Sequence, residues 1–321
     1  RPPCETLPWM ISRRVAGILL GYLADLAFAD PRRAHPVAGF GSAAAALERV
    51  THRDSRMAGV LHVVLLLAPL TVAAELVRRS WPALAVATWV SLGGTSLART
   101  GLAMADDLDR DDIDRARELL PSLCGRDPAQ LDHAGLTRAA LESIAENTSD
   151  AQVAPLLWAA LGGVPGVLAY RAVNTLDAMI GHRSPRYARF GWAAARLDDV
   201  ANYLPARLAG ALVVGCAPLV GGSPAEAWRA WRRDAAAHPS PNAGVVEAAF
   251  AGALGVRLGG PTRYHHELQI RPTLGDGRPA TVADLRRAVR LSRIVQAASV
   301  VAVTVLVSAA GRTGRRVSPR R

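Results

Sequence analysis

The sequence predicts an all-α, polytopic integral membrane protein with about four to six membrane-embedded helices joined by polar helical loops. Half of its 321 residues are hydrophobic, and they are grouped in long blocks separated by charged stretches. A bilayer selects this grouping, because a helix needs roughly 20 mostly apolar residues to cross the hydrocarbon layer. Arginine pairs stand next to these blocks, as the positive-inside rule describes. We therefore expect a multi-pass protein of the cytoplasmic membrane.

Six apolar blocks follow one another along the chain, at residues 15–29, 58–77, 82–98, 153–173, 204–222 and 294–310. The second and sixth are the cleanest membrane spans. The first is short and contains Asp25, and an ionisable side chain at membrane depth costs roughly 2.5 kcal/mol or more. Asp25 therefore either faces protein or water as a functional residue, or lies near a helix end and reaches the interface.

The fourth and fifth blocks contain helix-breaking residues, in the runs LGGVPGV (161–167) and CAPLVGG (216–222). Irregular backbone survives at membrane depth only where protein or water covers it. We expect these two blocks to enter the membrane without a plain crossing, which would bring the polar regions to one face. Ordinary spans with a kink are the alternative.

The net charge of +11 comes from arginine alone, because the chain contains no lysine. A basic balance can indicate nucleic acid, a membrane surface or an anionic substrate. The arginines lie beside apolar blocks, at Arg13–Arg14, at Arg78–Arg79 and between residues 312 and 321, and no nucleic-acid-binding motif is present. The distribution favours a lipid bilayer as partner and argues against nucleic acid.

The predicted organisation is an N-terminal tail (1–14), one integral membrane domain (15–310) and a basic C-terminal tail (311–321). Met10, followed by Ile-Ser-Arg-Arg, is the start that we expect for the native protein. The first residues lack the small-residue cleavage site of a signal peptide.

Three carboxylates share one face of a predicted helix in the run ESIAENTSD. Glu142, Glu146 and Asp150 follow at intervals of four residues, and such positions are stacked neighbours on a helix. Because like charges repel, we expect a cation opposite them. Mg²⁺, held by one or two carboxylates together with substrate phosphates, would satisfy them; a network of arginines would do so equally well.

A second polar cluster lies between two apolar blocks, in the run RLDDVANYLPARL. Its members are Arg196, Asp198, Asp199, Asn202 and Arg207, and Asn174 and Asp177 share a helix face just upstream. Carboxylates and amides suit a hard cation, and arginine forks suit phosphate or carboxylate groups. A helix cap or a salt bridge explains any one of these residues but not the whole set, because buried charges without partners are costly.

A third cluster follows in HPSPNAGVVE, where prolines and a glycine predict a turn before a helix of small residues. The turn presents His238, Ser240 and Asn242, and the helix carries Glu247. Backbone amides at a helix start can bind an anion. The small residues serve close helix packing equally well. Without lysine there is no Walker A loop, and the GxSxG, HExxH and CxxC patterns are absent.

Several runs resemble the CobD/CbiB family of cobalamin biosynthesis, and the resemblance extends from about Val15 to Leu306. The runs are DPRRAHPV (30–37), ESIAENTSD (142–150), APLLWAALGGVPG (154–166), YRAVNTLDAMIG (170–181), FGWAAARLDDVANYLPARL (190–208) and HPSPNAG with EAAFAGALGVRLGGP (238–261). Ala29 and Ala34 depart from the Gly-Asp-Pro and Pro-His-Pro that are usual in the family, and Ala151 follows Asp150 where glycine is common.

The resemblance implies an adenosylcobinamide-phosphate synthase, which is an ATP- and Mg²⁺-dependent ligase. Its partners would be the corrinoid adenosylcobyric acid, (R)-1-amino-2-propanol or its phosphate, the bilayer and other enzymes of the pathway. An accessory or regulatory membrane protein of the AmpE-like type, which shares the architecture, is the alternative. A transporter would place its polar residues within the spans instead of between them.

We assign roles at the matched positions. Metal-binding and catalytic roles fall to Glu142, Glu146, Asp198 and Asp199, with Asn202 orienting substrate and His238 as a base for the amine. Phosphate or carboxylate binding falls to Arg196, Arg207 and Arg257. Further substrate contacts are assigned to Asp30, His35, Asn174, Asp177, Asn242 and Glu247.

Overall fold

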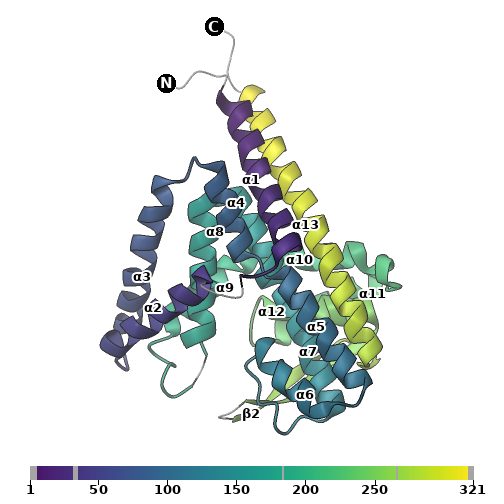
Figure 1. Ribbon diagram of the computed structural model, residues 1–321. Coiled ribbons are helices and arrows are strands. Elements are labelled where there is room, and N and C mark those ends of the chain that lie inside the picture. The colour runs from purple at the N-terminus through teal and green to yellow at the C-terminus, as the bar shows by residue number, and fades with distance from the viewer. Residues whose placement is uncertain (1–5, 32–34, 183, 265–266, 317–321) are drawn as a thin grey trace. The chain divides into compact units, whose positions relative to one another are not determined.

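The computed structural model describes residues 6–31, 35–182, 184–264 and 267–316. These residues form helices α1 to α13 and one small sheet (Figure 1). The predicted all-α class is confirmed. The predicted tails lie partly outside the described residues, at 1–5 and 317–321, and so do residues 32–34 of the DPRRAHPV run.

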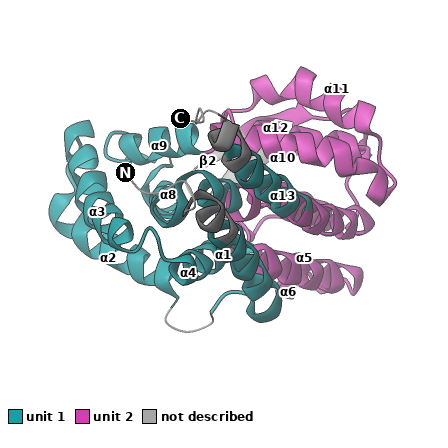
Figure 2. Ribbon diagram, turned by 90° about the horizontal axis from the view of Figure 1, so that it is seen from above, with its two compact units in different colours: residues 1–93, 154–201, 298–321 teal, residues 94–153, 202–297 magenta. Residues whose placement is uncertain are grey.

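The chain forms two compact units that are interleaved in sequence (Figure 2). Unit 1 consists of Arg1–Gly93, Ala154–Ala201 and Ala298–Arg321, and unit 2 of Gly94–Val153 and Asn202–Ala297. Helical segments continue from one unit into the other twice, at Val153–Ala154 and within α13. The single membrane domain expected from the sequence stays a prediction.

Unit 1 is built from α1 (Thr6–Phe28), α2 (Pro36–Thr51), α3 (Arg56–Leu76), α4 (Trp81–Ser91), α8 (Ala154–Ile180), α9 (Trp192–Ala201) and the end of α13 (Val282–Arg316). Helix α1 packs closely on α4, and α8 packs on α3, α4 and α9. A Cβ atom on Gly21 would lie 2.6 Å from Cβ of Thr88. Small residues of this kind let apolar helices approach closely without a hydrophobic driving force from water.

Unit 2 contains α5 (Gly94–Asp109), α6 (Ile113–Leu119), α7 (His133–Thr148), α10 (Tyr203–Cys216), α11 (Pro224–Asp234), α12 (Ala243–Leu254) and the start of α13. Helix α12 is almost wholly buried, and it packs against α10, α11 and α7. Its run of alanine and glycine allows neighbours on all sides.

A three-stranded sheet in unit 2 was not predicted. β1 (Val256–Tyr264) pairs with β2 (Glu267–Leu274) in antiparallel and with β3 (Arg278–Pro279) in parallel register. A bulge interrupts β1 between Leu258 and Gly260, and Gly259 there has φ +80°. The glycine-rich strand lacks the alternation of apolar and polar residues by which a strand is recognised.

Within the described part of the chain, four helical segments are long and apolar enough to cross a membrane: Arg56–Leu76, His133–Ile180, Tyr203–Val220 and Val282–Ala310. They overlap the second, fourth, fifth and sixth predicted blocks, and α1 covers the first. The third block is not one helix, because α4 ends at Ser91 and α5 begins at Gly94. Leu92 between them has extended backbone (φ −77°, ψ 154°), and the Gly93–Gly94 pair that follows disfavours a continuous helix.

Backbone breaks occur where glycine and proline predicted them. Within α8, Gly163 has φ +61° and ψ −144°, two residues before Pro165. Helix α10 gives way to a 3₁₀ turn (Ala217–Val220), which Gly221 ends with φ +70°. A π-helical turn (Ser149–Val153) joins α7 to α8.

Candidate functional site

Glu142 lies on the buried face of α7, in the interior of unit 2. Arg126, from the loop before α7, donates to Oε2 of Glu142, and the N–H of Gly259 donates to Oε1 over 2.7 Å. Arg138 donates to the carbonyl of Gly259 over 2.8 Å and lies 4.0 Å from Oε1 of Glu142. Both carboxylate oxygens therefore accept hydrogen bonds. Two arginines lie beside this carboxylate, which is the arrangement expected if arginines and not a metal ion balance its charge. The metal role of Glu142 stays a prediction.

Glu247, in the middle of α12, is the most unusual polar residue of unit 2. It is 1% exposed, and its Oε1 atom accepts no hydrogen bond from the residues that the structure describes. Nε2 of His238 lies 3.7 Å from this atom, and Nη1 of Arg271 lies 3.9 Å from it. Burial raises the pKa of Glu247 well above its usual range, and the nearby carboxylates of Glu142 and Glu146 raise it further. A buried carboxyl group with a pKa raised in this way is a candidate for proton exchange at a functional site.

His238 is held in place by the turn that leads into α12. Nδ1 of His238 lies 3.1 Å from both the N–H and the carbonyl oxygen of Ser240, and Nε2 faces Glu247 and lies 3.4 Å from Nη1 of Arg271. A Cβ atom on Gly244 would lie 2.5 Å from Cβ of His238, so only glycine leaves room for the ring. Burial lowers the pKa of His238, and the charge of Arg271 lowers it further. The imidazole is therefore neutral at neutral pH.

Asn242 and Arg207 join the same turn to α10. Nη1 of Arg207 donates to Oδ1 of Asn242 over 2.6 Å, and Nη2 donates to the Pro241 carbonyl over 3.0 Å. The guanidinium also stacks on Tyr203, 3.7 Å from the ring centroid. The structure thus brings Glu142, Glu247, His238, Asn242 and Arg207 together within one unit.

The other predicted residues of unit 2 lie around this cluster in different ways. Glu146 is half-buried, one turn beyond Glu142 on α7. Asn202 is buried at the start of α10, where its carbonyl accepts from the N–H of Ala206. Arg257 is exposed at the start of β1, and among the described residues no hydrogen bond or ion pair links it to Glu142 or Glu247.

A second polar cluster lies in unit 1. Nδ1 of His35 caps α2 by accepting from the Val37 N–H over 3.1 Å, and Nε2 lies 4.0 Å from Asp30. Burial lowers the pKa of His35; Asp30 opposes this shift and Arg171 adds to it. Nδ2 of Asn174 donates to Asp198 over 3.3 Å.

Asn174 lies in α8 and Asp198 lies in α9, and three further predicted residues of unit 1 lie in these two helices. Nη1 of Arg196 donates to Asp199 over 2.9 Å, within α9. Asp177 is half-buried near the end of α8, where its carbonyl accepts from the N–H of Gly181. All seven predicted residues of unit 1 thus lie in or near α2, α8 and α9.

The sequence analysis missed four arginines: Arg126, Arg138 and Arg271 in unit 2, and Arg171 in unit 1. Nη1 of Arg171 donates to Oδ1 of Asn174 over 3.3 Å. Arg126 and Arg271 come from a loop and a strand far from their partners in sequence. For Arg126 and Arg171 the sequence offers one indication of a role, which is that each arginine stands in an otherwise apolar or turn-forming run, CGRDP or YRAVN.

Comparison with known proteins identifies the family. The model of the CobD/CbiB protein family matches residues 18–292. The chain belongs to the CobD/CbiB family. Both polar clusters lie inside the matched range, and so do all the site residues predicted from the sequence.

Curated relatives in this family cover nearly the whole chain. "Cobalamin biosynthesis protein CobD" of Mycobacterium tuberculosis (strain ATCC 25618 / H37Rv) is 70% identical over 300 residues, which are 92% of this chain and 96% of that protein. The proteins of the same name from Chromobacterium violaceum and Rhodobacter capsulatus are 43% and 42% identical over 85% and 84% of this chain and 90% of each relative. No solved structure matches the chain.

Proposed function

We propose that this CobD/CbiB protein is an ATP-dependent ligase of cobalamin biosynthesis. It would join the free carboxylate of adenosylcobyric acid to the amine of (R)-1-amino-2-propanol phosphate, or of a related aminoalcohol, and yield adenosylcobinamide phosphate. ATP would convert the carboxylate into an acyl phosphate, the amine would attack the acyl carbon, and phosphate would leave as the amide forms. The amine must lose its protons to a base during this sequence.

The observation that carries the proposal is the buried Oε1 atom of Glu247, which accepts no hydrogen bond from the described residues and lies beside a neutral His238. An incoming ammonium group needs a proton acceptor, and general bases work best when their pKa lies near the working pH. Burial and the neighbouring carboxylates shift the pKa of Glu247 upward from its usual range, which is the direction that a general base needs. We propose that Glu247, once deprotonated, takes the proton of the amine directly, and that His238 beside it positions the amine.

Arginines would bind the anionic parts of the substrates. Arg271 lies beside the Glu247–His238 pair, and Arg207 is oriented by Asn242 and Pro241. Guanidinium groups match phosphate and carboxylate oxygens in pairs and keep their charge at all relevant pH values. In a chain without lysine, they are the natural means of neutralising charge that develops on a transferred phosphoryl group.

Mg²⁺ would supply charge neutralisation at the phosphates of ATP. The half-buried carboxylates of Asp198 and Asp199 in unit 1 have the oxygen chemistry that this ion prefers, and Glu146 in unit 2 is a separate candidate. Among the described residues, no three His, Cys, Asp or Glu side chains form a metal-binding group. These carboxylates would therefore contribute one or two ligands, with water and phosphate supplying the others, as is usual for Mg²⁺.

The test is product formation by the purified protein in detergent. Adenosylcobyric acid, ATP, Mg²⁺ and aminopropanol phosphate are supplied, and mass spectrometry detects the mass gain of the amide; each component is omitted in turn as a control. Product that requires ATP establishes the ligase. Corrinoid binding without any product would contradict the proposal and favour the accessory or regulatory role.

The metal assignment has its own test in Asp198→Ala and Asp199→Ala. We expect either change to abolish ligation while the protein remains folded in the membrane, because each removes a hard oxygen ligand. The measurement is turnover, with thermal unfolding of the same preparations as the control. Full turnover in both variants would rule out a metal role for these residues.

A further inference from the structure

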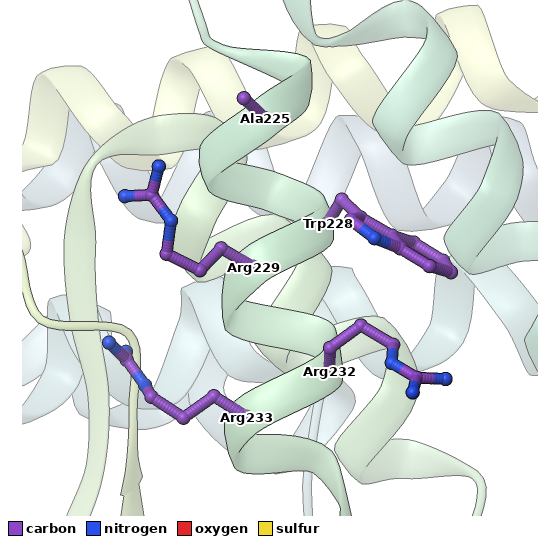
Figure 3. A pocket seen from close by; sticks show the side chains of 5 residues that line it. All are labelled: Ala225, Trp228, Arg229, Arg232 and Arg233. Carbon is purple, nitrogen blue, oxygen red and sulfur yellow. The ribbon is translucent and has the colours of Figure 1, made fainter.

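The exposed side of α11 forms a ridge of tryptophan and arginine on unit 2. Ala225, Trp228, Arg229, Arg232 and Arg233 line a shallow hollow along this helix (Figure 3). Trp228 is 49% exposed, and the guanidinium of Arg232 lies 5.6 Å from the centroid of its ring. The opposite side of the helix is buried through Ala227 and Ala230. A half-exposed tryptophan beside arginines has the amphipathic character of residues at a membrane–water interface.

The charge of this ridge suits an anionic partner. Arg232 forms no salt bridge among the described residues, whereas Arg229 pairs with Glu226 and Arg233 pairs with Asp234 and Asp276. Arg232 is therefore the cation of the ridge that is available to an anionic partner. Tryptophan together with arginine is the combination that anchors proteins at the headgroup level of a bilayer. Arginines near that level also attract anionic lipids.

The neighbouring helix α10 presents an apolar stripe. Tyr203, Leu204 and Leu219 are each more than half exposed, and Ala211 and Gly215 between them are exposed as well. Their spacing places Leu204, Ala211 and Gly215 on one side of α10, and Leu219 lies in the 3₁₀ turn that follows it. Together with its length and composition, this stripe makes Tyr203–Val220 suitable for contact with lipid chains.

The packing of α11 shows that α10 cannot be an ordinary membrane crossing. The chain turns back after Gly222, and Trp231 near the end of α11 lies against Gly210, close to the middle of the apolar segment Tyr203–Val220. If α10 crossed the bilayer, α11 beside it would place Arg229 and Arg232 in the hydrocarbon layer, where arginine is strongly disfavoured. A position along the membrane surface avoids this conflict.

We infer that α10 and α11 lie in the plane of the membrane interface and bind anionic phospholipid. The stripe of α10 contacts the acyl chains, and the ridge of α11 holds the headgroup phosphate between its arginines. This arrangement is that of an interfacial amphipathic helix pair, in which burial of the apolar side and attraction to anionic lipid act together. The inference does not depend on the proposed ligase activity.

The test uses the full-length protein in phosphatidylcholine vesicles that contain a fixed share of phosphatidylglycerol. Bromine atoms are placed on the acyl chains of one lipid or of the other, close to the glycerol, so that they quench only tryptophans at the interface. The contribution of Trp228 is the difference between the wild-type protein and Trp228→Phe. Trp231→Phe is the matched control, because Trp231 is turned toward Gly210 on the same helix.

We expect brominated lipid to quench the fluorescence of Trp228. Brominated phosphatidylglycerol should quench it roughly threefold or more efficiently than brominated phosphatidylcholine, because each arginine near an anionic surface adds attraction. Arg232→Ala should reduce this preference, whereas Arg115→Ala, an exposed arginine of α6, should leave it unchanged. No quenching of Trp228 would overturn the inference and indicate a ridge that faces water or an acidic protein. Equal quenching by the two lipids would overturn the selection of anionic lipid.

Discussion

Glu247 and Glu142 are both buried carboxyl groups in unit 2, but their surroundings differ. Glu142 accepts from Arg126 and from the Gly259 N–H, so its charged form is stabilised by hydrogen bonds. Oε1 of Glu247 accepts none, and the negative charge of Glu142 adds to the effect of burial. One carboxyl group is thus suited to holding structure, and the other to exchanging a proton.

The raised pKa of Glu247 predicts a stability that falls as the pH rises. Between the ordinary pKa of glutamic acid, about 4.3, and the raised value, the folded state holds a proton that the unfolded state has released. The free energy of unfolding therefore decreases with increasing pH over this interval. Glu247→Gln removes the titrating group, so its thermal midpoint in detergent should depend less on pH than that of the wild type. Equal pH dependence in the two proteins would show that Glu247 ionises normally.

Arg126 should be among the most important residues for stability, because it pairs with a buried charge. Removing one partner of a buried ion pair costs about 3–5 kcal/mol. We expect Arg126→Ala to lower the free energy of unfolding by about this amount, and Arg126→Ala combined with Glu142→Gln to recover part of it, since the charge is then gone. Denaturant unfolding in detergent measures both. A double variant that is no more stable than Arg126→Ala would exclude the charge as the cause.

At the scale of elements, glycine at position 163 determines the bend of α8. Its φ of +61° and ψ of −144° lie in a region that only glycine occupies without strain. Gly163→Ala should therefore cost about 1–3 kcal/mol. Gly162→Ala is the matched control, because that position has no neighbour within 4 Å of an added Cβ atom and alanine favours helix. Similar thermal midpoints for the two variants would mean that α8 straightens at no cost.

The elements followed from local sequence, but the environment of their side chains did not. The interval of four residues between Glu142 and Glu146 predicted one helix, and α7 has both. This interval does not predict that Glu142 is buried beside Arg126, because Arg126 comes from a separate loop. The turn and helix around His238 and Glu247 were likewise predicted, whereas the unpaired carboxyl oxygen results from tertiary packing against α7 and β2. The strand β1 was missed because its glycines conceal the pattern of a strand.

At the scale of the whole molecule, each unit is assembled from separate segments. Unit 1 takes its last segment, Ala298–Arg321, from the second part of α13. Truncation after Ala297 should therefore leave unit 2 intact and destabilise unit 1, because it removes buried residues such as Val300 and Val303. Limited proteolysis should then cut within residues 1–93 or 154–201 first.

Removal of residues 317–321 alone is the control for this truncation, because it leaves all of α13 in place. The shorter deletion should give the cleavage pattern of the full chain. Equal protease resistance of both units after truncation at Ala297 would show that unit 1 is stable without its last segment.

The interleaving of the units also affects how the protein is made. On the ribosome, residues 1–93 are synthesised long before the segment from Ala298 that completes their unit, and all of unit 2 is made before that segment emerges. Domains commonly fold one after another with the N-terminal domain first, but here the unit that begins first is completed last. Its first helices must remain in the bilayer with their packing surfaces unfilled until translation is nearly finished, and during that interval their apolar faces are available to lipid, to chaperones and to incorrect partners.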